Sequence, residues 1–263
     1  MNLQLNDKTA VITGATAGIG LEIARKLAVE GAEAILTGRS QAKLDAAVAG
    51  IRASGGGRVR GVLADAATAE GAAALLAAVP RVDILINNLG IYESKPFADI
   101  TDADWRNLFE VNVLSGARLA RGYFPGMLAQ NWGRVVFISS ESSLMIPQEM
   151  IHYGMTKTAQ LSISRGLAQL TRGTAVTVNS VLPGPTRSEG VVDFLRSVAT
   201  DPTAPADELE AEFFAKWRAT SLLQRMIEPE EIASLVAYLA SPLSPATNGA
   251  ALRVEGGLIP TAA

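Results

Sequence analysis

A tyrosine and a lysine near the middle of the chain have the types and the spacing for acid/base chemistry. In the stretch HYGMTK, Tyr153 precedes Lys157 by four residues, which places both side chains on one helix face with Cβ atoms roughly 5–6 Å apart. A free tyrosine has a pKa of about 10, too high for a base at neutral pH. A neighbouring ammonium favours the phenolate, so the pair suits proton transfer. The same spacing occurs on ordinary solvated helix faces, so other motifs must distinguish the two interpretations.

A glycine-rich turn provides a second candidate site. The stretch TGATAGIG follows the apolar run TAVIT and leads into a helical pattern that includes Ile23 and Leu27. In a strand–turn–helix context, glycines allow a tight turn and a close approach of backbone amides to a pyrophosphate at the helix N-terminus. Gly14, Gly18 and Gly20 therefore predict a dinucleotide-binding turn, with simple packing of the turn as the alternative.

The elements that must position these residues alternate along the whole chain. Short β-branched runs predict strands at 9–13, 34–37, 58–63, 82–86, 134–139, 175–182 and 251–254. Helical periodicity predicts helices at 41–53, 68–79, 104–130 and 150–172. This alternation predicts an α/β fold, a Rossmann-type doubly wound sheet of seven parallel strands with helices on both faces. We expect one dinucleotide-binding domain over residues 1–263.

Residues 186–227 depart from this rhythm because they contain no strand pattern. They include Pro202, Pro205 and an amphipathic stretch in which Leu209, Phe213 and Trp217 fall on one helical face. An insertion of this length after a strand predicts a helical lid over the substrate. The alternative is a helical hairpin packed as ordinary core.

Composition excludes several classes of site and partner. Hydrophobic residues make up 48% of the 263 residues and charged residues 19%, which is typical of a globular protein. There is no cysteine and His152 is the single histidine, so we expect no metal site. A net charge of −3 without a basic run argues against nucleic acid. The N-terminus lacks a signal-peptide pattern and no apolar run could span a membrane, so we expect a cytoplasmic protein.

Taken in order, the motifs resemble those of the short-chain dehydrogenase/reductase family, including its 3-oxoacyl-acyl-carrier-protein reductase-like members, over nearly the whole chain. The resemblance rests on the glycine-rich turn, the Asn-Asn-Leu-Gly segment at 87–90, a serine thirteen residues before the tyrosine, the Tyr-x-x-x-Lys pair and the Pro-Gly segment at 183–184. It implies that the catalytic residues are Asn112, Ser140, Tyr153 and Lys157. It implies that the cofactor-binding residues are Gly14, Thr16, Gly18, Ile19, Gly20, Arg39, Asp65, Asn88, Gly90, Tyr153, Lys157, Pro183, Gly184 and Thr186.

The resemblance also implies a role for each catalytic residue. Ser140 would hydrogen-bond the substrate oxygen, Asn112 would hold a water, and Lys157 would reach the nicotinamide ribose. Lys157 and the positive nicotinamide would lower the pKa of Tyr153 toward the working pH. Two positions depart from the family pattern: Leu89 replaces a small alanine, and Glu255 replaces an aspartate in a place that we interpret as structural.

The end of the second predicted strand bears on the choice of coenzyme. An NAD-preferring enzyme usually has an acidic residue there for the ribose 2′-hydroxyl, whereas this chain has Gly38 followed by Arg39. Gly38 leaves space for a 2′-phosphate and Arg39 can pair with it. We therefore expect NADP(H) to be preferred and NAD(H) to be possible. The alternative is that Arg39 only stacks on adenine.

These observations predict an NAD(P)-dependent oxidoreductase that interconverts an alcohol and a ketone or aldehyde, with Tyr153 as acid/base. Two alternatives are a catalytically silent dinucleotide-binding regulator and an enzyme like the sugar-nucleotide epimerases or dehydratases. The predicted helix at 104–130 is apolar on more than one side, so we expect burial between its own sheet and another subunit. With the family resemblance this predicts a homotetramer, and a dimer as second choice.

Overall fold

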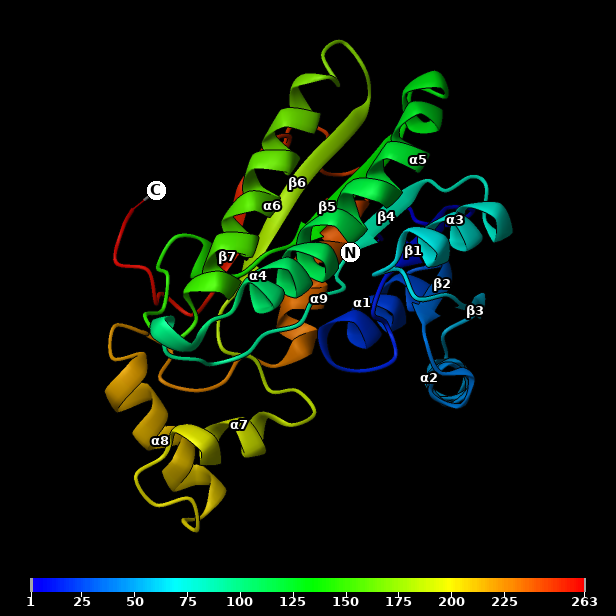
Figure 1. Cartoon of the computed structure of the whole chain (residues 1–263). Coiled ribbons are helices and arrows are strands. Elements are labelled where there is room, and N and C mark those ends of the chain that lie inside the picture. Colours follow the sequence, from blue (N-terminus) through cyan, green and yellow to red (C-terminus); the bar gives the residue numbers. More distant parts are fainter. Residues whose placement is uncertain (1, 263) are drawn as a thin grey trace.

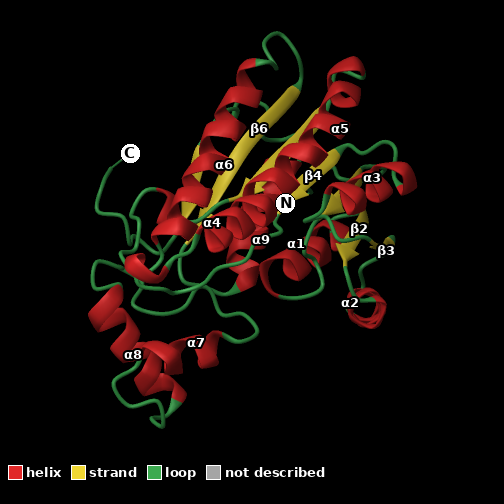
Figure 2. Ribbon diagram, in the orientation of Figure 1, coloured by secondary structure: helices red, strands yellow, loops and turns green. Residues whose placement is uncertain are grey.

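The computed structural model describes residues 2–262 and contains a seven-stranded sheet covered by helices on both faces (Figures 1 and 2). The strands are β1 (Thr9–Ile12), β2 (Glu33–Gly38), β3 (Val59–Leu63), β4 (Ile84–Asn87), β5 (Gly133–Ile138), β6 (Val176–Pro183) and β7 (Ala251–Val254). The α-helices are α1 (Gly18–Val29), α2 (Gln41–Ala53), α3 (Ala69–Ala78), α4 (Asp102–Phe109), α5 (Ser115–Ala129), α6 (Ile151–Gln169), α7 (Val191–Val198), α8 (Ala206–Trp217) and α9 (Pro229–Ala240). The predicted fold class is confirmed.

All neighbouring strands are parallel, in the order β3-β2-β1-β4-β5-β6-β7. Val11 of β1 pairs with Ile35 of β2 on one side and with Leu85 of β4 on the other. The chain therefore moves outward to β3 and then returns to start β4 beside β1. In such sheets ligands bind beyond the carboxyl ends of the strands at this reversal.

The sheet separates two apolar layers because successive strand residues point to opposite faces. Ile12 of β1 packs in one layer with Ile23 of α1 and Val236 of α9. Its neighbour Val11 packs in the other layer with residues of α3 and α5, including Leu119. Central strands buried on both faces read as nearly continuous apolar runs, which is why the sequence identified them.

The predicted single helix at 104–130 is wrong in one detail. A π-helical turn, Glu110–Leu114, separates α4 from α5. Ser115 Oγ, at the start of α5, donates a 2.5 Å hydrogen bond to the carbonyl of Val111 in this turn. The side chain of Asn112, also in the turn, bonds the backbone of Ile91 in the loop after β4. Turns of this kind inside α-helices are frequent at functional sites.

Residues 186–227, called here the α7–α8 segment, form two helices with a small apolar cluster of their own. Leu209, Phe213 and Phe214 of α8 are buried there with Leu195 of α7, and Trp217 is partly buried. The segment lies at the lower end of the sheet in Figure 1, where β6 ends. Within residues 2–262 no helix is long and apolar enough to cross a membrane.

Candidate functional site

A cavity of about 730 Å³ lies at the carboxyl ends of the strands, between the glycine-rich turn and the α7–α8 segment. Its walls include Gly18 of the turn, Ser140 after β5, Tyr153 of α6 and Phe213 of α8. The predicted site residues that line the cavity are Gly14, Gly18, Ile19, Gly20, Arg39, Asn88, Gly90, Ser140, Tyr153, Lys157, Pro183, Gly184 and Thr186. Folding therefore gathers residues from six separate parts of the chain around one space.

Three predicted residues do not line this cavity. Asp65 lies two residues beyond β3, on the same edge of the sheet as Arg39, and its carboxylate accepts a hydrogen bond from the Ala67 amide. Thr16 packs beside Gly38, and Asn112 is buried behind the cavity wall. Their proposed roles must therefore be indirect or must reach the cavity through neighbours.

The glycine-rich turn is shaped by backbone conformations and close contacts that suit glycine. Gly14 and Gly18 have φ values of 61° and 55°, a region that side chains with a Cβ rarely adopt. A Cβ on Gly20 would lie 2.4 Å from Asn88 Nδ2 and 2.6 Å from the Gly14 carbonyl oxygen. The turn is thus a backbone cradle at the start of α1, where amide groups favour an anion.

Asn88 fixes this cradle to the end of β4. Its side-chain amide donates to the carbonyls of Thr13 and Gly14 at 2.9 and 3.2 Å. In return, Thr13 Oγ1 accepts hydrogen bonds from the backbone amides of Asn88 and Leu89 at 3.0 and 2.9 Å. The side chain of Leu89 packs in the apolar layer that contains α3 and α5. It is not among the residues lining the cavity.

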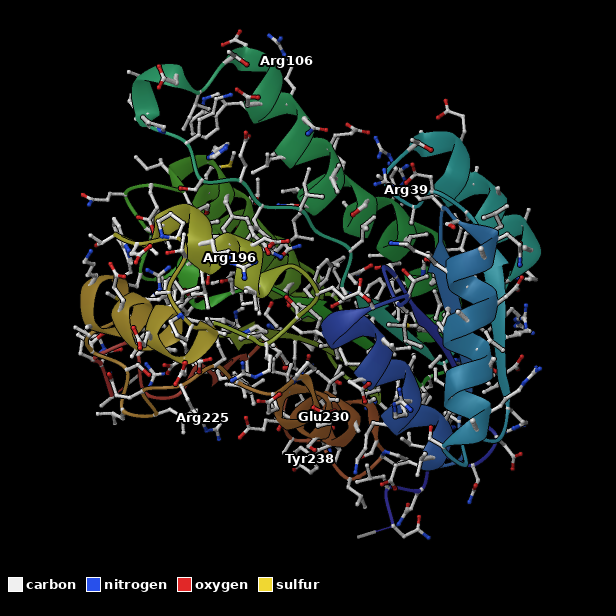
Figure 3. The ribbon with its side chains drawn as sticks, turned by 90° about the horizontal axis from the view of Figure 1, so that it is seen from below. Arg39, Arg106, Arg196, Arg225, Glu230 and Tyr238 are labelled. Carbon is white, nitrogen blue, oxygen red and sulfur yellow. The ribbon has the colours of Figure 1, made fainter. Side chains whose placement is uncertain are left out.

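Two cations stand at the outer end of the cavity. Arg39 follows β2 and Lys43 lies in the first turn of α2, and both line the cavity. Neither side chain makes an ion pair or a side-chain hydrogen bond with any residue in 2–262. Figure 3 shows Arg39 well apart from Arg196 of α7. Lys43 was missed from the sequence, although its position four residues after Arg39 on a predicted helix start was a usable signal.

The space at Gly38 differs from the expectation. A Cβ on Gly38 would lie 2.8 Å from Thr16 Cγ2 and 3.5 Å from two atoms of Leu44. The methyl group of Thr16, and not open space, therefore faces this glycine. A larger residue at position 38 must displace Thr16.

The polar residues after β5 meet α6 at the inner end of the cavity. Lys157 Nζ donates a 3.0 Å hydrogen bond to the Ile138 carbonyl and lies 5.5 Å from the centre of the Tyr153 ring. Ser139 Oγ donates to the Lys157 carbonyl at 2.9 Å. Ser140 is buried at the end of β5, and its Oγ accepts a hydrogen bond from the Ser142 amide. The sheet end and the helix are thereby held in fixed register.

The pKa values of Tyr153 and Lys157 both respond to burial. Burial lowers the pKa of Lys157 to about 8, although the charge of Glu141 acts in the opposite direction. Burial also raises the pKa of Tyr153 well above its usual range, and the carboxylate of Glu141 adds to this, while a hydrogen bond from Ser140 lowers it. The expected depression of the Tyr153 pKa is therefore not provided by the protein's own groups, because burial disfavours the charged phenolate and the Glu141 carboxylate adds to this effect.

Asn112 connects the π-helical turn to this region. Its Oδ1 accepts from the Ile91 amide at 2.8 Å, and its Nδ2 donates to the Ile91 carbonyl and to Thr156 Oγ1 at 2.9 and 3.0 Å. A Cβ on Gly90 would lie 3.3 Å from Lys157 Nζ and 3.5 Å from Asn112 Oδ1. Gly90 therefore allows the loop after β4 to pass closely over both side chains.

The segment after β6 approaches the cavity through another close contact. A Cβ on Gly184 would lie 2.8 Å from Glu255 Cα, so glycine is needed where β6 passes the end of β7. Glu255 is buried and accepts hydrogen bonds from the amides of Leu258 and Ile259. These contacts agree with its interpretation as a structural residue.

Sequence reasoning assigned no role to Glu141, and the structure places it beside the candidate catalytic serine. The Glu141 side chain is buried, lines the cavity and accepts a hydrogen bond from Ser140 Oγ. Its other carboxylate oxygen lies 3.5 Å from Nε of Arg218, which directly follows α8. No local sequence pattern predicts the pair of Glu141 and Arg218, because the two residues come from distant parts of the chain.

A series of aromatic rings joins the candidate catalytic tyrosine to the α7–α8 segment. Tyr92 lies edge-on to Tyr153 and to Phe194, with ring centres 6.2 and 6.1 Å apart. Phe194 in turn contacts Phe213 at 5.8 Å. Tyr92, Phe194 and Phe213 also line the cavity, so its inner end combines polar groups with an apolar wall.

The donor set fits a nicotinamide dinucleotide. A glycine cradle at a helix N-terminus lies at one end, with two cations that have no acidic partner among residues 2–262. A serine, a tyrosine and a lysine lie at the other end. The cradle and the cations suit phosphate groups, and the cavity connects them to the polar groups of α6. This arrangement can bring a nicotinamide close to a carbonyl or hydroxyl group.

Comparison with known proteins agrees with this geometry. A family model described as short chain dehydrogenase matches residues 8–197. YvaG of Bacillus subtilis (strain 168), an uncharacterized oxidoreductase, is 49% identical over 260 residues, which cover 98% of each chain. Galactitol 2-dehydrogenase (L-tagatose-forming) of Cereibacter sphaeroides is 35% identical over 256 residues, covering 97% of this chain and 96% of that one.

Among solved structures, L-sorbose reductase from Gluconobacter frateurii in complex with NADPH and L-sorbose superposes with a TM-score of 0.92. It is 29% identical and the match covers 99% of this chain and 100% of that one. The family model matches more than half of the chain, and relatives match it almost end to end. The chain belongs to the short-chain dehydrogenase family and is an NAD(P)-binding dehydrogenase/reductase that acts on CH–OH or carbonyl groups.

Proposed function

We propose that the protein interconverts an alcohol and a ketone, with Tyr153 as the general acid/base. One observation carries this proposal: Ser140, Tyr153 and Lys157 face one cavity together with the glycine-rich turn. When bound, the nicotinamide supplies or accepts the hydride. The protein's own residues orient the substrate and move the proton.

Each polar group at the inner end then has a defined task. Tyr153 Oη donates a proton to the substrate oxygen during reduction, and its raised pKa keeps that proton in place until it is needed. Ser140 lies beside it, and its single O–H, which donates to Glu141 in the free protein, would turn to donate to the oxygen on which charge develops. Lys157, held by the Ile138 carbonyl, would hold the nicotinamide ribose. Asn112 supports this arrangement through the loop after β4.

The remaining cavity residues would hold the rest of the cofactor. The cradle of Gly14, Gly18 and Gly20 would take the pyrophosphate, and Pro183, Gly184 and Thr186 would contact the nicotinamide end. Arg39 and Lys43 have no acidic partner among the described side chains, and their two charges support a preference for NADP(H) over NAD(H). A stacking role for Arg39 alone would leave Lys43 unexplained. The α7–α8 segment would serve as the substrate lid of a single domain.

Neither alternative function is favoured by a particular contact. A silent binding protein has no need of Ser140, Tyr153 and Lys157 together around one cavity. The other alternative is an epimerase or dehydratase of the sugar-nucleotide type. The names of two relatives, galactitol 2-dehydrogenase and L-sorbose reductase, instead support an alcohol or ketone substrate.

We also propose that the protein forms a homotetramer, with a dimer as second choice, and that it is cytoplasmic. The support for assembly is an apolar hollow of about 330 Å³ on the outer surface of α5 and α6. Ala117, Phe124, Ile163 and Leu167 line this hollow. Such surfaces are commonly covered by another subunit.

The test of the acid/base role is the substitution Tyr153→Phe. It keeps the ring and its contact with Tyr92 but removes the proton, so turnover should fall roughly 10²- to 10⁴-fold. Binding of the reduced cofactor, followed by its fluorescence, should change little because the phenol is not the main contact. Near-normal turnover in this variant would refute the assignment of Tyr153.

A further inference from the structure

The inner end of the cavity holds a buried charge pair that the proposed chemistry does not use. Glu141 is 5% exposed and Arg218 is 8% exposed, and both line the cavity. Arg218 lies over the ring of Phe213, 5.5 Å from its centre. The pair therefore connects Ser140, the candidate catalytic serine, to the α7–α8 segment along the wall of the cavity.

The carboxylate of Glu141 keeps acceptor capacity for another group. It receives one hydrogen bond, from Ser140 Oγ, whereas a carboxylate offers about four acceptor positions. Its contact with Arg218 Nε, at 3.5 Å, is longer than an ordinary hydrogen bond. Buried carboxylates need hydrogen-bond donors, so a donor on the substrate would find a prepared partner.

Arg218 likewise retains donors. Within residues 2–262 the one hydrogen bond of its guanidinium runs from Nη1 to the Trp217 carbonyl at 2.8 Å. A guanidinium carries five N–H groups, and Glu149 lies 3.7 Å from Nη1 without bonding it. An acceptor next to a donor is the combination that a hydroxyl group satisfies, because a hydroxyl both donates and accepts.

The position of Glu141 and Arg218 relative to Ser140 decides which substrate hydroxyl they would bind. Ser140 Oγ is the atom beside Tyr153 that would bond the reacting oxygen, and the Glu141 carboxylate is one hydrogen bond beyond it. Oxygens on adjacent carbons are themselves about one hydrogen-bond length apart. A substrate whose reacting oxygen meets Ser140 would therefore present a hydroxyl on the next carbon to Glu141 and Arg218.

We infer that Glu141 and Arg218 form a subsite for a hydroxyl group on the carbon next to the reacting carbon. The substrate class is then neutral α-hydroxy ketones and the corresponding vicinal diols, an inference that rests on the proposed function. A carboxylate at the same place would meet the negative charge of Glu141, while Arg218 is already flanked by two acids. Anionic 2-oxo acids are therefore disfavoured.

Three ketones with the same carbon skeleton test this subsite: 1-hydroxy-2-butanone, 2-butanone and 2-oxobutanoate. In the wild type, kcat/KM for the hydroxy ketone should exceed that for 2-butanone by roughly 10- to 100-fold, the usual worth of a hydrogen bond to a charged group. The 2-oxo acid should be the poorest of the three. Both reduced cofactors are used, so that coenzyme preference does not hide turnover.

The variants separate recognition from general damage. Glu141→Gln keeps the shape of the side chain but removes its charge. The ratio of kcat/KM for the hydroxy ketone to kcat/KM for 2-butanone should therefore fall to about 5-fold or less. Glu149→Gln is the matched control because Glu149 also flanks Arg218 but does not line the cavity. That variant should keep the wild-type ratio. Using the ratio removes any effect of Glu141 on Ser140 that is common to both substrates.

Equal kcat/KM values for the hydroxy ketone and 2-butanone would overturn the subsite, as would a ratio that Glu141→Gln leaves unchanged. With either of these outcomes, the proposed function would still stand if Tyr153→Phe lost activity toward both the hydroxy ketone and 2-butanone. If the wild type binds the cofactor but reduces none of the three ketones, the subsite is refuted for this class. The proposed function would then fail separately if a wider panel of alcohols and ketones also gave no turnover.

Discussion

Substituting Arg39 by alanine should change the choice of coenzyme more than any other property of the enzyme. The guanidinium has no acidic partner among residues 2–262 and lines the cavity beside Lys43, so in the free protein its charge is not already neutralised. A hydrogen bond to a charged group contributes about 1.5–3 kcal/mol. Arg39→Ala should therefore lower kcat/KM for NADPH by roughly 10- to 100-fold and change the value for NADH by no more than about 3-fold, since 2′-phosphate contacts are absent from NADH.

Lys43 and Arg39 are both exposed, but a lysine ammonium is a point charge on a flexible stem, whereas arginine can bind a phosphate through two parallel hydrogen bonds. Exposed ion pairs contribute about 0.2–1 kcal/mol. Lys43→Ala should accordingly lower kcat/KM for NADPH only about 2- to 5-fold. A reversal toward NADH needs an acid at position 38, but Gly38→Asp alone would push its Cβ against Thr16 Cγ2 at 2.8 Å. The double variant Thr16→Ala, Gly38→Asp removes that methyl group and should favour NADH where the single variant merely loses activity.

The assay is kcat/KM for both reduced cofactors with one ketone at a fixed saturating concentration, in the wild type and in each variant. Salt dependence provides a control, because the contribution of Lys43 should weaken as ionic strength rises. If the wild type prefers NADH and Arg39→Ala leaves the NADPH/NADH ratio unchanged, the phosphate role of Arg39 is wrong. If Arg39→Ala lowers both values equally, Arg39 stacks on the adenine and does not read the phosphate.

Two further predictions concern pH and assembly. Only the ammonium form of Lys157 carries charge beside Tyr153, so kcat/KM for reduction should fall as the pH rises through about 8, the pKa of Lys157. The Glu141 charge raises the Lys157 pKa. The variant Glu141→Gln should therefore show this fall at a lower pH. A pH profile whose limb lies near the ordinary lysine value of about 10 would contradict this effect of burial. Light scattering at micromolar concentration should give a tetramer mass, and Ala117→Arg in the α5–α6 hollow should reduce it; a monomer mass in the wild type would contradict the proposed assembly.

The sheet and the glycine-rich turn could be predicted because their signals are local. Strands such as β4 and β5 are buried on both faces, so each reads as a short apolar run, and the helices between them require parallel pairing with right-handed crossovers. The same order brings the turn, Ser140 and the Tyr153–Lys157 pair to one edge of the sheet. Gly14 and Gly18 adopt positive φ values, a backbone conformation that glycine adopts readily, so the glycines in the sequence also predicted the conformation of the turn.

What the tertiary structure alone decided is set by contacts between distant segments. In the π-helical turn, the Asn112 side chain makes hydrogen bonds with the backbone of Ile91 in the loop after β4. The spacing of apolar residues along a helix does not predict such bonds. Glu141 gains a role because folding buries it between Ser140 and Arg218. The sequence by itself determined the fold class and the residues with acid/base and phosphate-binding chemistry. Burial and long-range packing decided their pKa values and the polarity of the substrate end, because desolvation and ion pairing depend on which groups become neighbours in space.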